Sequence, residues 1–174
     1  MPTFGSKNNI YAMKELNIPF KVVCYQEEEL EPADRQLIEA ARQATYHSYA
    51  PYSHFSVGAA ARLANGQLLS GSNQENAAYP SGLCAERTTL FYANSQYPDV
   101  AIETLAIAAR NEQGEFVSRP IAPCGACRQV MLESEARQGK PLRLLLCGTE
   151  GICEIKQASH LLPLSFDASS MKTE

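Results

Sequence analysis

Residues 123–127 read Pro-Cys-Gly-Ala-Cys, with two cysteines three positions apart at the start of a helix predicted over residues 125–137. A second predicted helix, over residues 84–97, opens on Cys84 and carries Glu86 in its first turn. A thiol at a helix N-terminus feels the positive end of the backbone dipole, which lowers its pKa and favours the thiolate that metals bind. If the two helix starts face each other, three thiolates can hold one Zn²⁺ and leave its fourth position open, as catalytic zinc sites do.

The segments around these two helices predict a single α/β domain. Apolar residues at helical spacing predict a further helix that begins near Pro32 and runs to about Tyr49. The expected strands are residues 55–63 and 68–73, joined by the turn Asn65-Gly66, followed by residues 102–109, 142–147 and 152–155. Because helices and strands alternate after the first hairpin, we expect an α/β sandwich.

Length and composition are typical of one globular domain and exclude several classes of protein. The chain has 174 residues, of which 45% are hydrophobic and 20% charged. No stretch approaches the about 20 consecutive apolar residues of a membrane helix, and residues 1–9 lack the apolar run of a secretory signal. A net charge of −4 argues against a surface that binds polyanions.

The first thirty residues form an N-terminal extension of unknown role, and we assign residues 31–174 to the zinc domain. Within the extension, residues 21–25 have the short pattern of a strand. We expect this strand to pair with a sheet edge or with a neighbouring subunit.

The six cysteines, at positions 24, 84, 124, 127, 147 and 153, are expected to be reduced. A chain of this length buries a core without disulfides and shows no export signal, which favours a cytoplasmic protein. Two other interpretations of the cysteines remain. One is a thioredoxin-type redox pair, although this C-x-x-C lies unusually far along the chain. The other is a closed four-thiolate site completed by Cys147 or Cys153, although Cys147 ends an apolar strand pattern and suits a core thiol.

Two segments together resemble the signature of the zinc-dependent deaminases, in which a histidine or cysteine is followed by x-E and, downstream, by P-C-x-x-C. They are Cys84-Ala85-Glu86-Arg87 and Pro123-Cys124-Gly125-Ala126-Cys127-Arg128-Gln129. Cysteine as the first ligand is similar to the free-nucleoside branch, the cytidine deaminases. Residues 51–59 and 73–80 are similar to substrate-side segments of that family, so that the resemblance spans about residues 32–166.

The resemblance implies a fold, a metal and a reaction. The fold is a three-layer α/β/α sandwich with a mixed sheet of about five strands. The metal is one Zn²⁺ per chain, held by Cys84, Cys124 and Cys127. The reaction is hydrolytic deamination of cytidine and 2′-deoxycytidine to uridine and 2′-deoxyuridine with release of ammonia, a step of pyrimidine salvage.

The resemblance also implies roles for single residues. Glu86 is the catalytic proton carrier, and Arg87 donates hydrogen bonds to sulfur to offset the excess negative charge of the thiolates. Arg128 either assists Arg87 or lies on the surface. The implied substrate contacts are Phe55 beside the base, Asn73 and Glu75 at the ribose 3′-hydroxyl, Ala85 at the pyrimidine edge, and Tyr79 and Phe166 in sites that neighbouring subunits of a homotetramer complete.

The expected partner is a small-molecule nucleoside, with no nucleic acid and no membrane. A carboxylate at Glu75 would repel a phosphate on the 3′ oxygen, and no basic stripe with interleaved aromatic residues offers a nucleic-acid groove. Two alternatives stay open. A deaminase of another aminopyrimidine nucleoside, such as a blasticidin-type antibiotic, shares the zinc signature. A non-catalytic zinc or thiol-redox module would have no need of Glu86.

Overall fold

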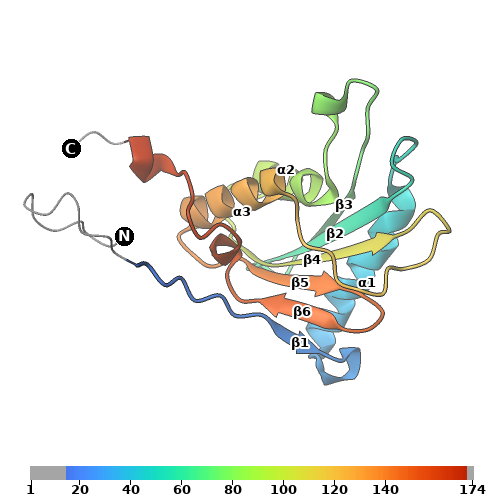
Figure 1. Ribbon diagram of the computed structural model, residues 1–174, viewed down its shortest axis with the longest axis horizontal. Coiled ribbons are helices and arrows are strands. Elements are labelled where there is room, and N and C mark those ends of the chain that lie inside the picture. Colours follow the sequence, from blue (N-terminus) through green and yellow to red (C-terminus); the bar gives the residue numbers. More distant parts are fainter. Residues whose placement is uncertain (1–14, 172–174) are drawn as a thin grey trace, which may run out of the picture.

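Helices cover both faces of a mixed sheet in the computed structural model, which describes residues 15–171 (Figure 1). The six strands of this part of the chain are β1 (Val23–Tyr25), β2 (Ser56–Leu63), β3 (Leu68–Ser72), β4 (Ile102–Arg110), β5 (Arg143–Cys147) and β6 (Ile152–Ile155). Its α-helices are α1 (Pro32–Ala44), α2 (Ala85–Gln96) and α3 (Gly125–Gln138). The strand order is β1-β6-β5-β4-β2-β3, and only β4 and β5 run parallel among these six strands. The predicted α/β sandwich is confirmed, with six strands where about five were expected.

Successive residues of β2 alternate between two cores, which makes the fold three layers deep. Ala59 and Ala61 pack in the core that the sheet shares with α2 and α3, whereas Ala60 packs in the core beneath α1. This is the two-residue period of a strand that is buried on both faces. Next to these alanines, Gly58 lies so close to α1 that an added Cβ would meet the backbone oxygen of Ala41. Only glycine fits at that crossing.

The two helices that follow cysteines begin where the sequence predicts. Cys84 and Cys124 are the N-cap residues of α2 and α3, both in extended conformation. At its other end α3 stops at Gly139, whose φ of 63° is left-handed and therefore suits glycine. None of the helices in the described part of the chain combines the length and apolar character needed to cross a membrane.

The predicted strand within residues 21–25 exists as Val23–Tyr25, and it pairs with the edge of the sheet. It runs antiparallel to β6, which leaves β1 as the outermost strand (Figure 1). The Tyr25 hydroxyl donates a hydrogen bond of 2.9 Å to the Glu154 carboxylate in β6, so a side chain adds to the backbone pairing. Residues 1–14 of the extension lie outside the described residues.

A disulfide joins Cys24 in β1 to Cys153 in β6, so the expectation of reduced thiols is wrong for this pair. The two residues are direct partners in the antiparallel register, and their Cα atoms lie 4.2 Å apart. Their separation of 129 residues in the chain conceals this proximity from sequence reasoning. Cys147, by contrast, is a buried free thiol in the core, as expected.

Replacing Cys24 with serine is expected to lower the melting temperature by about 5 °C or more in non-reducing buffer. The disulfide closes a long loop, and native disulfides of this kind contribute about 2–4 kcal/mol, largely by restricting the unfolded chain. Calorimetry of the parent and of the variant measures the difference. Added reductant should lower the melting temperature of the parent to that of Cys24→Ser and leave the variant unchanged. Equal melting in non-reducing buffer would show that the bond contributes nothing.

Candidate active site

Three thiols meet where the first turns of α2 and α3 lie side by side. Cys84 caps α2, Cys124 caps α3, and Cys127 lies one turn further along α3. The Cys84 and Cys124 sulfurs are 3.8 Å apart, those of Cys124 and Cys127 are 3.4 Å apart, and all three lie within 4.8 Å of one another. A tetrahedral zinc with Zn–S bonds of about 2.3 Å needs sulfurs about 3.8 Å apart. The donor set therefore fits one zinc ion.

The thiol cluster has three members in the described residues, not four. Cys147 is buried in the core beneath α1, on the opposite side of the sheet from the cluster. Cys153 is engaged in its disulfide with Cys24. The closed four-thiolate alternative is therefore wrong, and the arrangement leaves a coordination position for water or substrate.

Hydrogen bonds onto Cys84 make it the thiolate of the metal-free cluster. A hydrogen bond from Cys127, together with one from Arg87 Nη2 at 3.9 Å, lowers the pKa of Cys84 to about 5. The same contact with Cys84, together with burial, raises the pKa of Cys127. Zinc binding must therefore displace protons from the cluster. Arg87 also donates to the Gly82 carbonyl at 3.3 Å, which holds the guanidinium against the start of α2.

Glu86 lies beside the cluster without belonging to it. Its side chain is 4% exposed, and it is not among the three residues whose ligand atoms converge. Burial raises the pKa of Glu86, so its carboxylate accepts a proton more readily than an exposed glutamate does. A glutamate placed only to complement a helix N-terminus would have no need of this burial. The arrangement suits proton transfer.

A pocket of about 340 Å³ contains two of the predicted substrate residues. It is lined by Tyr52, Ser53, Glu75, Asn76, Tyr79 and Gly82. Glu75 Oε2 accepts hydrogen bonds from the Tyr52 and Ser53 backbone amides at 2.9 and 3.2 Å. Donors from Ser53 and Tyr52 hold the pKa of Glu75 below its usual range, which keeps the carboxylate ionised. The Tyr79 ring packs edge-on against Tyr52, with the ring centroids 5.7 Å apart.

Asn73 does not line this pocket but fixes the backbone beside it. Its Oδ1 accepts from the Val57 amide at 2.8 Å, and its Nδ2 donates to the Phe55 carbonyl at 2.9 Å. Asn73 is 8% exposed, so these bonds are largely shielded from water. The structure thus links two predicted substrate residues, Asn73 and Phe55, in a way that the sequence did not indicate. Ala85, the first residue of α2, is fully buried.

Phe166 lies against α3 and is 62% exposed. Its carbonyl accepts a hydrogen bond of 2.9 Å from Nε2 of Gln129, the fifth residue of that helix. Sequence reasoning missed the role of Arg128 here, which donates from Nε to the Pro123 carbonyl at 2.8 Å and from Nη1 to the Leu161 carbonyl at 3.2 Å. No sequence signal indicates these bonds, because both acceptors are backbone oxygens.

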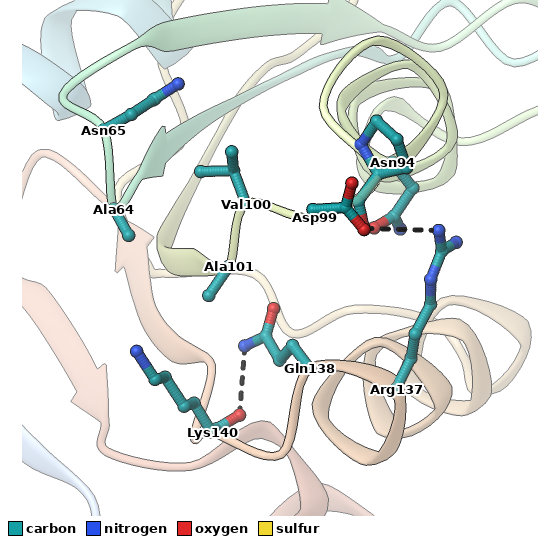
Figure 2. A pocket seen from close by; sticks show the side chains of 10 residues that line it. Ala64, Asn65, Asn94, Asp99, Val100, Ala101, Arg137, Gln138 and Lys140 are labelled. Atoms are coloured by element: carbon teal, nitrogen blue, oxygen red, sulfur yellow. Dashed lines mark hydrogen bonds between the residues drawn. The ribbon is translucent and has the colours of Figure 1, made fainter.

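A larger cavity, of about 620 Å³, lies at the other ends of α2 and α3 (Figure 2). Asn94 and Arg137 line it from the last turns of these helices, and Gln138 donates to the Lys140 carbonyl at its rim. A helix of this length spans about 18 Å. The cavity is therefore about a helix length away from the thiols and takes no part in the site.

The chain matches the family model described as the cytidine and deoxycytidylate deaminase zinc-binding region over residues 31–139. A curated cytidine deaminase from Halalkalibacterium halodurans is 42% identical over 139 residues, which is 79% of this chain and 98% of that protein. A second, from Sporosarcina psychrophila, is 36% identical over 78% of this chain and 93% of its own length.

Solved structures give the same likeness. The crystal structure of cytidine deaminase from Burkholderia pseudomallei matches with a TM-score of 0.62 and 41% identity, covering 75% of this chain and 97% of that one. That of cytidine deaminase from Mycobacterium tuberculosis matches with a TM-score of 0.59 and 32% identity, covering 76% and 95%.

Proposed function

The chain belongs to the cytidine and deoxycytidylate deaminase family, and from this premise we propose that it deaminates cytidine and 2′-deoxycytidine by zinc-dependent hydrolysis. The products are uridine or 2′-deoxyuridine and ammonia. The observation that carries the proposal is the convergence of three thiols beside a buried carboxylate. One zinc ion per chain belongs at this cluster, with Cys84, Cys124 and Cys127 as its ligands.

Glu86 moves the protons of the reaction. When bound, zinc supplies a water molecule of lowered pKa as the nucleophile that replaces the amino group at C4 of the cytosine ring. Glu86 would accept one proton from this water and pass it to ring N3, and it would then take the second proton from the hydroxyl now on C4 and give it to the departing amine, which leaves as ammonia. The raised pKa of Glu86 brings its proton affinity closer to that of the groups it serves.

Arg87 reduces the excess negative charge of the thiolate ligands. Three thiolates would carry more negative charge than a divalent cation neutralises, and this excess would weaken the Lewis acidity of a bound zinc. By donating to the Cys84 sulfur, Arg87 withdraws electron density from one ligand. We assign it no direct contact with the substrate.

The substrate side selects a free nucleoside. Glu75, held ionised at the pocket wall, accepts from the ribose 3′-hydroxyl and repels a phosphate at that position. Asn73 supports the sugar and anchors the backbone of Phe55, which packs beside the base. The remaining proposed contacts are Ala85 at the pyrimidine edge, and Tyr79 and Phe166 at the entrance.

Absorbance-monitored incubation of the purified, zinc-loaded protein with cytidine tests the reaction. We expect turnover together with one zinc per chain. One bound zinc without turnover of cytidine or 2′-deoxycytidine would overturn the nucleoside assignment and favour another aminopyrimidine, for which a blasticidin-type antibiotic is the probe. Absence of zinc from a folded, reduced protein would favour the thiol-redox alternative.

We further propose that the enzyme is a cytoplasmic homotetramer whose sites are completed by neighbouring subunits. In the single chain Tyr79 is 75% exposed and Phe166 62% exposed, an unusual state for aromatic residues of a substrate site. The cytoplasm keeps the three site thiols reduced and available to zinc, whereas the Cys24–Cys153 disulfide is of a kind that is rare in that compartment. Sedimentation equilibrium should give about four times the 19.1 kDa of one chain, and a monomer mass would contradict the assembly.

A further inference from the structure

The guanidinium of Arg128 connects residues 124–127, here called the metal-binding turn, to the C-terminal part of the chain. Arg128 is the residue after Cys127 and is half-buried in the first turn of α3. Its Nε donates to the carbonyl of Pro123, immediately before Cys124, at 2.8 Å. Its Nη1 donates to the carbonyl of Leu161 at 3.2 Å, across 33 residues of sequence.

Leu161 begins a segment that depends on α3 for its position. Residues 161–166, here called the tail strap, run from a buried leucine to the exposed Phe166, and residues 162–166 belong to no helix or strand. Each end of the strap carries a backbone carbonyl that accepts a hydrogen bond from a side chain in the first two turns of α3. Arg128 holds Leu161, and Gln129 holds Phe166 at 2.9 Å.

We propose that Arg128 is a positioning residue that fixes the tail strap to the metal-binding turn and thereby sets the place of Phe166 at the substrate site. This inference rests on the function proposed above. Arginine suits the role because its planar fork presents several donors in fixed directions, so that one side chain can serve two carbonyls. A lysine ammonium lacks this rigid fork and would not hold both carbonyls in the same geometry.

Loss of Arg128 should act on substrate binding more than on the metal. The three thiols would remain in place. The strap would lose the hydrogen bond at Leu161 and keep the Gln129 bond at Phe166, the bond from the Leu162 amide to Ser159 and the packing of Leu161 in the core. Phe166 would then be less well placed, and binding energy that it gives to the substrate would be lost. The expected signature is a raised KM with a smaller change in kcat.

The experiment compares Arg128→Met and Arg128→Lys with the parent, all zinc-loaded. Zinc content, amide hydrogen exchange of residues 161–166, and KM and kcat for cytidine are measured. For Arg128→Met we expect one zinc per chain, about tenfold faster exchange in the strap and about a tenfold higher KM, the loss typical of one charge-assisted hydrogen bond. Arg128→Lys should recover part of both effects. Arg137→Met is the matched control, because Arg137 lies on the same helix and donates to the Pro98 carbonyl at 3.4 Å at the far end.

A double-mutant cycle tests whether Arg128 acts through Phe166. Phe166→Ala should raise KM, and adding Arg128→Met should raise it little further, because the two changes remove the same contribution. Fully additive effects, unchanged exchange in the strap, or loss of zinc from Arg128→Met would each overturn the proposal. If Arg128→Met does not fold, Arg128→Lys and Gln129→Met weaken the strap separately and must show the same exchange and KM effects. If the parent does not act on cytidine, the exchange data still decide whether Arg128 holds the strap.

Discussion

Replacing Glu86 with glutamine is expected to lower kcat for cytidine by about 10³–10⁴-fold while one zinc per chain stays bound. Glutamine keeps the shape of the side chain and can still form hydrogen bonds, but it cannot carry a proton from water to the ring. Because the Glu86 side chain is only 4% exposed, bulk water is poorly placed to take over this transfer. Steady-state kinetics and metal analysis of the same preparation measure the two quantities together.

The pH dependence of kcat/KM in the parent protein is a second test of the role of Glu86. Glu86 must be ionised to accept the proton from water, so kcat/KM should fall as the pH drops through its pKa. Burial raises that pKa above the about 4.3 of an ordinary glutamate, which moves the acid limb to higher pH. Glu133→Gln is the matched control, because Glu133 is exposed on α3, and it should leave both rate and profile unchanged. Near-parental turnover by Glu86→Gln would remove Glu86 from the mechanism.

Cys127→Ser is expected to abolish turnover by emptying the metal site. Cys127 is fully buried within the thiol cluster, and a serine hydroxyl is a far weaker zinc ligand than a thiolate. We expect zinc affinity to fall by well over about 100-fold, the upper range for losing only a supporting residue of such a site. Metal analysis after dialysis against a weak chelator measures the loss.

Cys147→Ala serves as the control for this substitution. Cys147 is also a buried free cysteine, but it lies in the core beneath α1 and outside the cluster. The Cys147→Ala variant should retain its zinc and its turnover even if its free energy of unfolding falls. Full zinc and normal turnover in Cys127→Ser would contradict the three-thiolate ligand set.

The parts of this structure that local patterns determine were predictable from the sequence. The helix starts at Cys84 and Cys124 follow from local sequence, and a helix N-terminus favours a thiolate whatever the fold around it. The approach of Cys84 to the C-x-x-C cysteines was predicted by the resemblance to the zinc-dependent deaminase signature, because the chemistry of the helix starts gave it only on the condition that they face each other. Continuous runs of apolar, small and β-branched residues likewise predicted the buried strands.

The features that sequence reasoning missed depend on register or on backbone acceptors. The pairing of Cys24 with Cys153 requires β1 to lie beside β6 in one particular register, and no local pattern encodes that. Arg128 and Asn73 form their hydrogen bonds with backbone carbonyl or amide groups. Because such groups occur all along the chain, the type of the partner residue gives no sign of these bonds in the sequence. Such contacts become visible only in the folded chain.

The spacing of the three site sulfurs also determines how the metal-free enzyme would be inactivated by oxidation. Cys124 is exposed, and its sulfur lies 3.4 Å from that of Cys127. The Cys124 sulfur also lies 3.8 Å from that of Cys84, the thiolate of the metal-free cluster. An oxidant that converts Cys84 to a sulfenic acid would find the Cys124 thiol ready to condense with it into a disulfide, with loss of water. When zinc is bound, these thiolates are coordinated to the metal and are protected from oxidation. Protein stored without metal in air would therefore lose the capacity to reload, and zinc would restore turnover only after a reductant had reopened the site.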